Sequence, residues 1–431
     1  MNASGPKNSF KPLLTFCIFV MLSVSPVVAS ADEIQNRFDA AMAALEADQI
    51  YTARRLLREL LTDYPTLYRA RLELARADYL ARDLDAAETE VLRVLEDPEL
   101  PPSVQTTLLA FLAQIRDVQQ TFEQKHRWSA DFYGGGMYDS NVNYGVERDI
   151  VDLGGQDFVV LPGSQPIDAW ASVLDGGVLY TYAPGIQFQA GEQTGFFLWQ
   201  TQGNAYNRSY IDESDYNLAV ATLRTGPAWV VPESWSATIG LQGDQIWYGG
   251  SKLAFFTTVN PTVSWNLSEA TVMSAGLAYT KRHYNKDVDG GRDGEMYRGN
   301  LDISRVFMEQ DIGVQAGVAY TDFQADNDIL AYKGPDIYAG ITYKAWQQGT
   351  IFTSVGYRKF KYQEALLLVP DLPKRDDDEY RLSAGFEHKL VDGVFSGWVV
   401  RGEWIYTDNR SNLNLYDFDR DQISLGLQRS F

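Results

Sequence analysis

The chain has 431 residues, a formal net charge of -20, and 13% aromatic residues. This acidic balance excludes nucleic acid as a partner, because phosphate binding requires a basic surface. The single cysteine, Cys17, excludes a disulfide framework. A chain rich in Tyr, Trp and Gly suits a β-barrel with aromatic girdles, although a secreted carbohydrate-binding β protein has a similar composition.

Residues 1–31 predict a signal peptide. Lys7 and Lys11 precede an apolar stretch at 13–22, which is too short to span a membrane as a helix. The triplet Ala-Ser-Ala at 29–31 provides a small-x-small cleavage site. The chain is therefore expected to be exported, and no later run of 18 apolar residues predicts a transmembrane helix.

Residues 32–126 predict a helical domain, because their apolar residues recur at helical spacing. A repeat at about 34 residues resembles the tetratricopeptide pattern. Its matching apolar positions are Ala53, Leu57, Leu60 and Leu61 in one unit and Ala87, Val91, Val94 and Leu95 in the next. We expect two repeats and a solvating helix at about 102–122, located in the periplasm. A plain helical bundle is the alternative.

From 127 to 431 the apolar period changes from 3.6 to 2, which predicts a closed antiparallel outer-membrane β-barrel of about 14 strands. The expected strands are 127–138, 170–182, 194–206, 214–224, 235–248, 254–266, 270–285, 295–307, 312–324, 335–345, 350–362, 379–389, 395–408 and 421–431. The fold class is therefore a small helical domain followed by a transmembrane barrel. A soluble β-sandwich or propeller is the alternative.

The connections between the strands support this topology. Five connections expected on the outside are long or rich in Asp, Asn and Gly, namely 139–169, 286–294, 325–334, 363–378 and 409–418. Inner connections such as 308–311 and 390–394 are short, as in outer-membrane barrels. Two inner connections, 183–193 and 225–234, are longer than this topology expects.

The last strand resembles the terminal signal by which bacterial barrels are recognised for insertion. Leu425, Leu427 and Phe431 share its outward face, and polar residues alternate with them. Barrel-assembly machinery and outer-membrane lipid are therefore expected partners.

Charged residues on the opposite face of several strands are candidates for a lumen wall. They are Arg298, Asp302, Arg358, Arg381, Glu387, Arg401 and Glu403. They would either shape a passage or form an ordinary porin-like wall of paired charges.

No pattern of catalytic chemistry is found. His126, His283 and His388 lie far apart, and no HExxH motif or nucleophile elbow is present. The Asp-rich stretch 287–294 resembles a calcium loop only faintly, because Arg298 stands where the twelfth position requires Glu. We therefore expect no enzyme activity, no metal and no cofactor.

The end of the first strand carries the run Gly-x-x-Asp-Ser-Asn-x-Asn, in which the fixed positions are Gly136, Asp139, Ser140, Asn141 and Asn143. With the signal peptide, the helical repeats and the barrel, this run resembles the surface lipoprotein assembly modifiers of Gram-negative bacteria. Read without the resemblance, it is an Asx-rich turn.

The resemblance implies an outer-membrane translocator that moves an exported protein cargo, either a surface lipoprotein or a secreted soluble protein. The periplasmic helices would then capture the cargo. The short helical domain leaves two alternatives open, an exopolysaccharide exporter of the repeat-plus-barrel type and a passive porin.

Overall fold

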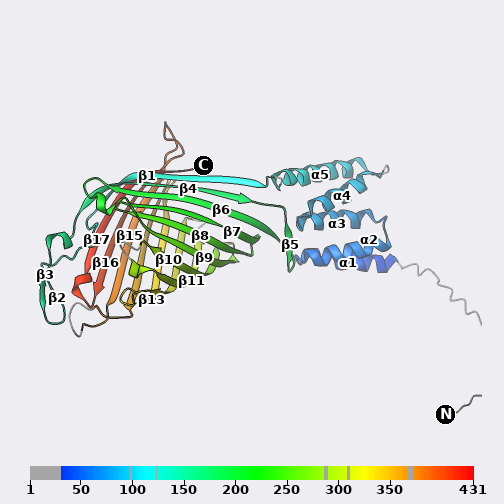
Figure 1. Ribbon diagram of the computed structural model, residues 1–431. Helices are drawn as coiled ribbons and strands as arrows, with labels where there is room; N and C mark the ends of the chain where they lie inside the picture. The colour runs from blue at the N-terminus through cyan, green and yellow to red at the C-terminus, as the bar shows by residue number, and fades with distance from the viewer. Residues whose placement is uncertain (1–30, 98–99, 123, 286–289, 308–310, 367–371) are drawn as a thin grey trace, which may run out of the picture.

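The computed structural model describes residues 31–97, 100–122, 124–285, 290–307, 311–366 and 372–431. A stack of helices lies beyond one end of a closed antiparallel barrel (Figure 1). The fold class expected from the sequence is therefore confirmed. Residues 1–30 of the predicted signal peptide lie outside the described residues, and the compartment of the helices stays a prediction.

The helical domain consists of α1 (Ala31–Glu46), α2 (Ile50–Asp63), α3 (Tyr68–Leu80), α4 (Leu84–Leu95) and α5 (Pro102–Phe122). Each helix packs against the next one along the chain. The repeat is visible in the backbone, because Asp48 and Arg82 occupy corresponding turns with φ of 56° and 62°. None of the described helices is long and apolar enough to cross a membrane.

The repeated apolar positions form two small cores. Leu57 and Leu60 centre the first core, and their counterparts Val91 and Val94 centre the second. All four side chains are fully buried. Helix α5 covers the second core, as expected of a solvating helix. The repeat pattern therefore fixes both the helix pairs and their stacking.

The barrel consists of β1 (His126–Asp139), β4 (Ala169–Tyr182), β6 (Gln193–Tyr210), β7 (Leu218–Val231), β8 (Trp235–Tyr248), β9 (Ser251–Ser268), β10 (Thr271–Tyr284), β11 (Gly294–Phe307), β12 (Ile312–Ala325), β13 (Tyr332–Trp346), β14 (Gly349–Tyr362), β15 (Asp376–Lys389), β16 (Val399–Ser411) and β17 (Phe418–Ser430). Neighbours in this order pair antiparallel, and β1 pairs with β17 to close the ring. We call the barrel end next to the helices the inner end and the opposite end the outer mouth (Figure 1).

Both of the long inner connections have a structural explanation. Strand β7 continues to Val231, so the second connection is only the short turn at 232–234. The sequence pattern predicts an end of this strand at 224, because Gly226 and Pro227 interrupt the alternation. The first connection contains β5 (Gln187–Ala190), which extends β6 as a hairpin beyond the barrel.

The two faces of the wall differ as the alternation predicts. On β17 the outward Ile423, Leu425 and Phe431 are exposed, whereas Gln422 and Ser424 face the lumen. Outward aromatic pairs lie near both rims, for example Tyr138 with Trp170 at the outer mouth and Trp128 with Tyr180 at the inner end. Such girdles sit where a barrel meets the membrane surface.

Loops at the outer mouth pack together into a lobe that contains the hairpin of β2 (Ile150–Asp152) and β3 (Asp157–Val159). Its core includes Val151, Leu372 and Leu413, which come from three different outer connections. Leu366 packs against this core, while 367–369 of the same apolar run lie outside the described residues. The outer loops therefore support one another.

Deleting Phe431 should lower the amount of folded barrel in the membrane. The backbone of Phe431 exchanges two hydrogen bonds with Ala130, of 2.8 and 3.1 Å, and these close the inner end of the β1–β17 seam. Heat-modifiable mobility on gels would measure the folded fraction, with Phe431→Tyr as the control that keeps the aromatic ring and the backbone. Normal folding of the deletion variant would contradict this expectation.

Candidate functional site

The family-like run at the end of β1 lies on the seam between the first and last strands. Asp139 is fully buried on the lumen side of the wall, and the guanidinium of Arg420 on β17 binds both of its carboxylate oxygens. The hydroxyl of Tyr210 also donates to Asp139 at 2.6 Å, and the amide of Gln422 donates at 3.2 Å. A buried ion pair is stable when its remaining polar atoms are hydrogen-bonded in this way.

The polar residues that follow Asp139 tie the first outer loop to the same seam. Ser140 and Asp421 exchange two hydrogen bonds, of 2.8 and 2.9 Å. The buried amide of Asn141 donates to the carbonyls of Gly145 and Asp419. These contacts combine an Asx-rich turn with a clamp across the seam, because Asp419 and Asp421 belong to the last strand.

The other two positions of the run behave differently from each other. The side chain of Asn143 donates to the carbonyl of Gln165 at 2.7 Å and accepts from the amide of Ile167 at 3.0 Å. It thereby joins the two ends of the first outer loop. Gly136 faces outward, and a Cβ at that position would meet open space, so packing does not require a glycine there.

The candidate lumen-wall residues form separate ion-pair networks rather than one cluster. Asp336 on β13 binds Arg298 at 2.8 Å and Arg358 at 3.2 Å. On the adjacent strands β15 and β16, Arg401 binds Glu387 at 2.6 Å and Glu403 at 3.1 Å. Five of the seven expected wall residues are therefore ion-paired, two of them with Asp336.

Two of the candidate wall residues stand apart from these networks. Asp302 accepts hydrogen bonds from Asn300 and from Tyr338, the latter at 2.8 Å. Arg381 is exposed, and it has no carboxylate partner within the part of the chain that the structure describes. Sequence reasoning missed Asp336 and Tyr338, although their alternation on β13 places them on the lumen face.

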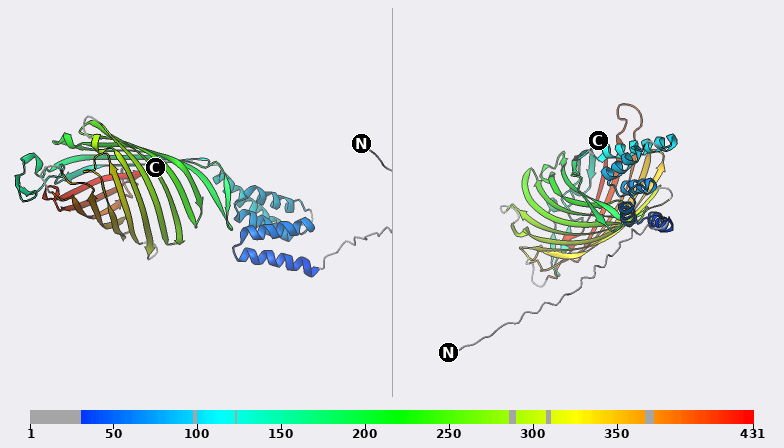
Figure 2. Two further views of the ribbon diagram at one scale, coloured as in Figure 1. Left: turned by 60° about the horizontal axis from the view of Figure 1, so that its bottom comes forward. Right: turned by 90° about the vertical axis from the view of Figure 1, so that its right-hand side faces the viewer.

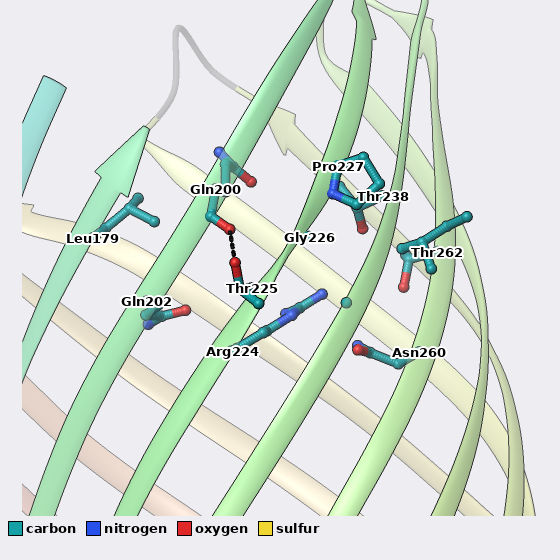
Figure 3. Close-up of a pocket in the computed structure, with 12 residues that line it drawn as sticks. Leu179, Gln200, Gln202, Arg224, Thr225, Gly226, Pro227, Thr238, Asn260 and Thr262 are labelled. Atoms are coloured by element: carbon teal, nitrogen blue, oxygen red, sulfur yellow. Dashed lines mark hydrogen bonds between the residues drawn. The ribbon is translucent and has the colours of Figure 1, made fainter. Parts of the chain in front are cut away.

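A pocket of about 330 Å³ with a mixed polar and apolar lining lies in the lumen wall over β4 to β9 (Figure 3). Arg224 and Asn260 point toward each other across it. With the amide of Asn260 flipped, its oxygen accepts a hydrogen bond from the Arg224 guanidinium at 3.1 Å, and its nitrogen donates to the carbonyl of Gly240 at 3.1 Å. Gln200, Gln202 and Thr262 also line the pocket. Amides, hydroxyls and a guanidinium suit water and polar backbone groups better than hydrocarbon.

The hairpin of β5 and β6 docks the barrel onto the helical domain. Its tip is a two-residue turn in which Gly191 has φ 65°, and the next residue, Glu192, caps helix α2. The Glu192 carboxylate accepts from the backbone amides of Tyr51 and Thr52, at 2.7 and 3.1 Å, and from the Thr52 hydroxyl at 2.9 Å. Helix α2 has no side-chain cap of its own at Gln49. Glu192 therefore satisfies helix donors that would otherwise lack a protein partner.

The hydrogen bonds also shift the acidity of this carboxyl. Burial raises the pKa of Glu192, but the hydrogen bonds from Thr52 and Tyr51 outweigh burial, and the net shift is downward. The carboxylate form of Glu192 is therefore the one that caps helix α2.

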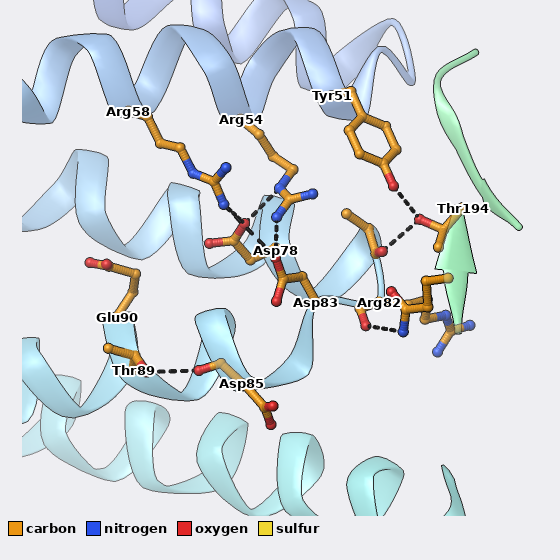
Figure 4. A network of polar contacts seen from close by, with 12 residues as sticks. Tyr51, Arg54, Arg58, Asp78, Arg82, Asp83, Asp85, Thr89, Glu90 and Thr194 are labelled. Atoms are coloured by element: carbon orange, nitrogen blue, oxygen red, sulfur yellow. Dashed lines mark hydrogen bonds and ion pairs between the residues drawn. The ribbon is translucent and has the colours of Figure 1, made fainter. Parts of the chain in front are cut away.

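Further polar contacts surround this cap (Figure 4). Thr194 on β6 donates to the carbonyl of Ala81 at 2.6 Å and shares a hydrogen bond with the Tyr51 hydroxyl at 2.8 Å. Behind Tyr51, the buried Arg54 binds Asp78 at 2.6 Å and so links α2 to α3. We call the hairpin 187–194 the docking hairpin.

The described residues show no metal site, and the expectation of no enzyme activity stays a prediction. They contain no group of three or more His, Asp or Glu side chains that could hold a metal ion. The His283 ring lies 2.9 Å from Asp293, and His388 accepts a hydrogen bond from Trp346. Part of the Asp-rich stretch, 286–289, lies outside the described residues.

Comparison with known proteins places this geometry in a family. A sequence model of the surface lipoprotein assembly modifiers matches residues 128–431. The chain belongs to the surface lipoprotein assembly modifier family. A relative from Pasteurella multocida (strain Pm70) with that name is 21% identical over 426 residues, which cover 93% of this chain and 77% of the relative.

Solved structures resemble the barrel at low similarity. An anion-selective porin from Comamonas acidovorans is 10% identical with a TM-score of 0.40, and the match covers 71% of this chain and 99% of the porin. A bacterial polysaccharide outer membrane secretin is 9% identical with a TM-score of 0.38, over 70% of this chain and 98% of the secretin. Similarity of this degree carries no argument about function.

Replacing Arg420 by Gln should destabilise the folded barrel strongly, because Asp139 would remain buried without its cation. Breaking a buried pair in this way costs about 3–5 kcal/mol. Arg410→Gln is the matched control, since Arg410 pairs with Asp408 at the surface and such pairs contribute about 0–1 kcal/mol. The temperature at which each variant loses its heat-modifiable form would measure the difference. Equal temperatures for the two variants would refute the seam clamp.

Replacing Glu192 by Ala should release the helical domain from the barrel. Spin labels at Ala47→Cys and Glu269→Cys should give a narrow distance distribution in the otherwise unchanged protein and a broad one with Glu192→Ala. Glu233→Gln, in the neighbouring inner turn, is the control. A narrow distribution in the alanine variant would show that other contacts suffice.

Docking should also depend on pH. Because docking lowers the pKa of Glu192, the stabilisation that its carboxylate gives to docking is fully present above the ordinary carboxyl pKa and is lost as the pH falls through the lowered value.

Proposed function

We propose that this protein transfers an exported lipoprotein across the outer membrane to the cell surface. The observation that carries the proposal is the docking hairpin, which holds a repeat-type helical domain at the inner end of a polar-walled barrel. The family name supports a lipoprotein as the cargo.

In this proposal the helical domain captures the cargo in the periplasm. Stacked helix pairs form an extended surface that suits an unfolded polypeptide. The domain is attached twice, through the short link from α5 to β1 and through the Glu192 cap on α2. This double attachment keeps captured cargo next to the barrel opening.

The barrel then provides a path past lipid. A polypeptide in hydrocarbon would lose on the order of several kcal/mol for each unpaired polar group. The lumen offers the hydrogen-bonding wall that such a chain needs, including Arg381 and the amides around Arg224. No bond is broken in this transfer, so we propose a translocator rather than an enzyme.

The outer-membrane lipid and the barrel-assembly machinery are the other proposed partners. The apolar belt and the aromatic pairs of the outer wall fit lipid, and Phe431 with Leu425 and Leu427 forms the outward row of the terminal strand.

Deleting residues 33–125 while keeping the signal peptide should stall cargo in the periplasm, although the barrel still inserts. The readout is the surface exposure of a co-expressed candidate lipoprotein on intact cells, with Arg37→Gln as the control that changes only an exposed ion pair of α1. The folded barrel is followed in parallel by heat-modifiable mobility. If export is unaffected by the deletion, or if purified barrels conduct small solutes and no protein cargo responds, a passive porin replaces the proposal.

Protease added to intact cells should cut only the outer connections, namely 139–169, 286–294 or 363–378. Cleavage within 40–120 on intact cells would contradict a periplasmic helical domain. Permeabilised cells provide the control, because the helical domain should then become accessible.

A further inference from the structure

Three barrel strands contain a proline in their interior, and the hydrogen-bond ladder skips two residue pairs beside each of them. Between β7 and β8 the pairing passes from Thr225–Leu241 to Ala228–Thr238, around Pro227. The same kind of gap occurs at Pro261 between β9 and β10 and at Pro335 between β13 and β14. A closed barrel has no edge at which proline is harmless, so each gap is a weak line in the wall.

Side chains brace two of these gaps. At β13–β14, Asp336 and Arg358 form an ion pair across the strands beside Pro335. At β9–β10, hydrogen bonds join Thr258 to Thr280 on one side of the gap and Ser264 to Ser274 on the other. The strands therefore stay connected although their backbones do not pair at the gap.

The other two gaps have a brace on their inner side, Asp336–Arg358 at β13–β14 and Ser264–Ser274 at β9–β10, whereas the brace at β7–β8 lies on the outer side. Thr222 donates to Asp244 at 2.7 Å toward the outer mouth. Between the gap and the inner turn, the paired residues 228–231 and 235–238 are joined through their backbones, and no side-chain hydrogen bond links them in the described chain. The terminal seam, by contrast, is clamped by Asp139 and Arg420. The inner half of β7–β8 is therefore the least fastened of these seams.

The two faces of this gap differ in polarity. The pocket of Figure 3 lies directly over it, and its polar side chains, among them Arg224, face the lumen. Such a pocket can hold water against backbone groups that the ladder leaves unpaired. Pro227 and Ile239, at the gap itself, also belong to the lining of the pocket. On the outer face beside them, Leu223 and Leu241 are apolar and exposed. A group crossing the wall here would pass from a wet, polar lumen into lipid.

The gap also lies next to the point where the helices are attached. The docking hairpin continues β6, and β6 is the neighbour of β7. Phe188 of this hairpin packs near Trp235, the first residue of β8, with ring centroids 6.2 Å apart. Figures 1 and 2 show β5 and the start of β6 reaching from this side of the barrel toward the helices. Cargo held by the helices would therefore arrive beside the inner half of β7–β8.

We propose that the β7–β8 seam opens sideways toward lipid while a lipidated polypeptide is transferred. The proposal rests on the proposed function and names the part of the wall that serves it. A lipoprotein has hydrocarbon chains that belong in the bilayer and a polypeptide that belongs in the polar lumen. An opening between β7 and β8 accommodates both, with the acyl chains against Leu223 and Leu241 and the polypeptide against the pocket of Arg224.

Engineered disulfides test this seam, because Cys17 is the sole cysteine and lies in the predicted signal peptide. Paired residues on antiparallel strands have a Cα spacing that a disulfide can bridge. The test variants are Thr225→Cys with Leu241→Cys and Ala228→Cys with Thr238→Cys, on the two sides of the gap. The controls are Ile303→Cys with Ala316→Cys across β11–β12, where the ladder is continuous, and Tyr138→Cys with Ile423→Cys across β1–β17.

Oxidised β7–β8 variants should lose surface display of the lipidated cargo to the level of cells without the protein, and reductant should restore it. The same cargo with its lipidated cysteine replaced should still cross in every variant. Unchanged display in the bridged β7–β8 variants would overturn the proposal, as would an equal loss with β11–β12 bridged or a loss with β1–β17 alone. If neither cargo form depends on the protein at all, the proposed function itself fails.

A second measurement does not depend on cargo or on variants. Amide hydrogen exchange of the full chain in lipid vesicles should show faster exchange at the inner half of β7–β8 than at β11–β12. Equal protection of the two seams would overturn the proposal.

The disulfide variants need a folding control. Heat-modifiable mobility of each variant, measured in its oxidised and in its reduced form, verifies that the variant is folded.

Discussion

Closure of the backbone hydrogen-bond ladder is the constraint on which the rest of this structure depends. In hydrocarbon, an unpaired amide or carbonyl has no water to bind, so the sheet must return to its first strand. Here that return is secured at both ends of β1–β17. Phe431 pairs with Ala130 at the inner end, and Asp139 with Arg420 clamps the outer mouth. The wall is weak where proline prevents pairing, and these positions are where a barrel of this kind can change shape.

Attachment of the helical domain follows a different principle. The docking contacts described above are polar, and the most specific of them is a carboxylate placed at the amino end of α2. A charged cap of this kind fixes orientation through direction-dependent hydrogen bonds and buries little apolar surface. Such an interface holds the helices in place without the permanence of a hydrophobic core. This property suits the capture and release of cargo that we propose for the domain.

Local patterns in the sequence predicted the elements well, because periodicity reports which face of each element is buried. The corresponding residues Leu57 and Val91 fill equivalent places in the two helical cores. The alternation on β17 separates lumen from lipid as expected. The extent of β7 was predicted poorly, since the proline in its interior reads as the end of a strand.

Partners that are distant in sequence could not be predicted in this way. Arg420 lies 281 positions from Asp139, and only the closure of the ring brings them together. Glu192 lies 140 positions from Thr52, in a connection that looked like an overlong turn. The Asp-Ser-Asn run gave the one local signal for the seam, because short polar side chains at a strand end must find backbone partners. The contacts of this run with β17 depend on the pairing register between β1 and β17, which cannot be read from a single sequence.

The most direct test of the account is transfer by the purified protein alone. Full-length protein in lipid vesicles would be offered a lipidated candidate cargo from the side that carries the helical domain, and the cargo reaching the opposite side would be measured by protease sensitivity. The account predicts that cargo appears on the far side only when the docked helical domain is present. Free passage of small solutes without any transfer of cargo would contradict it.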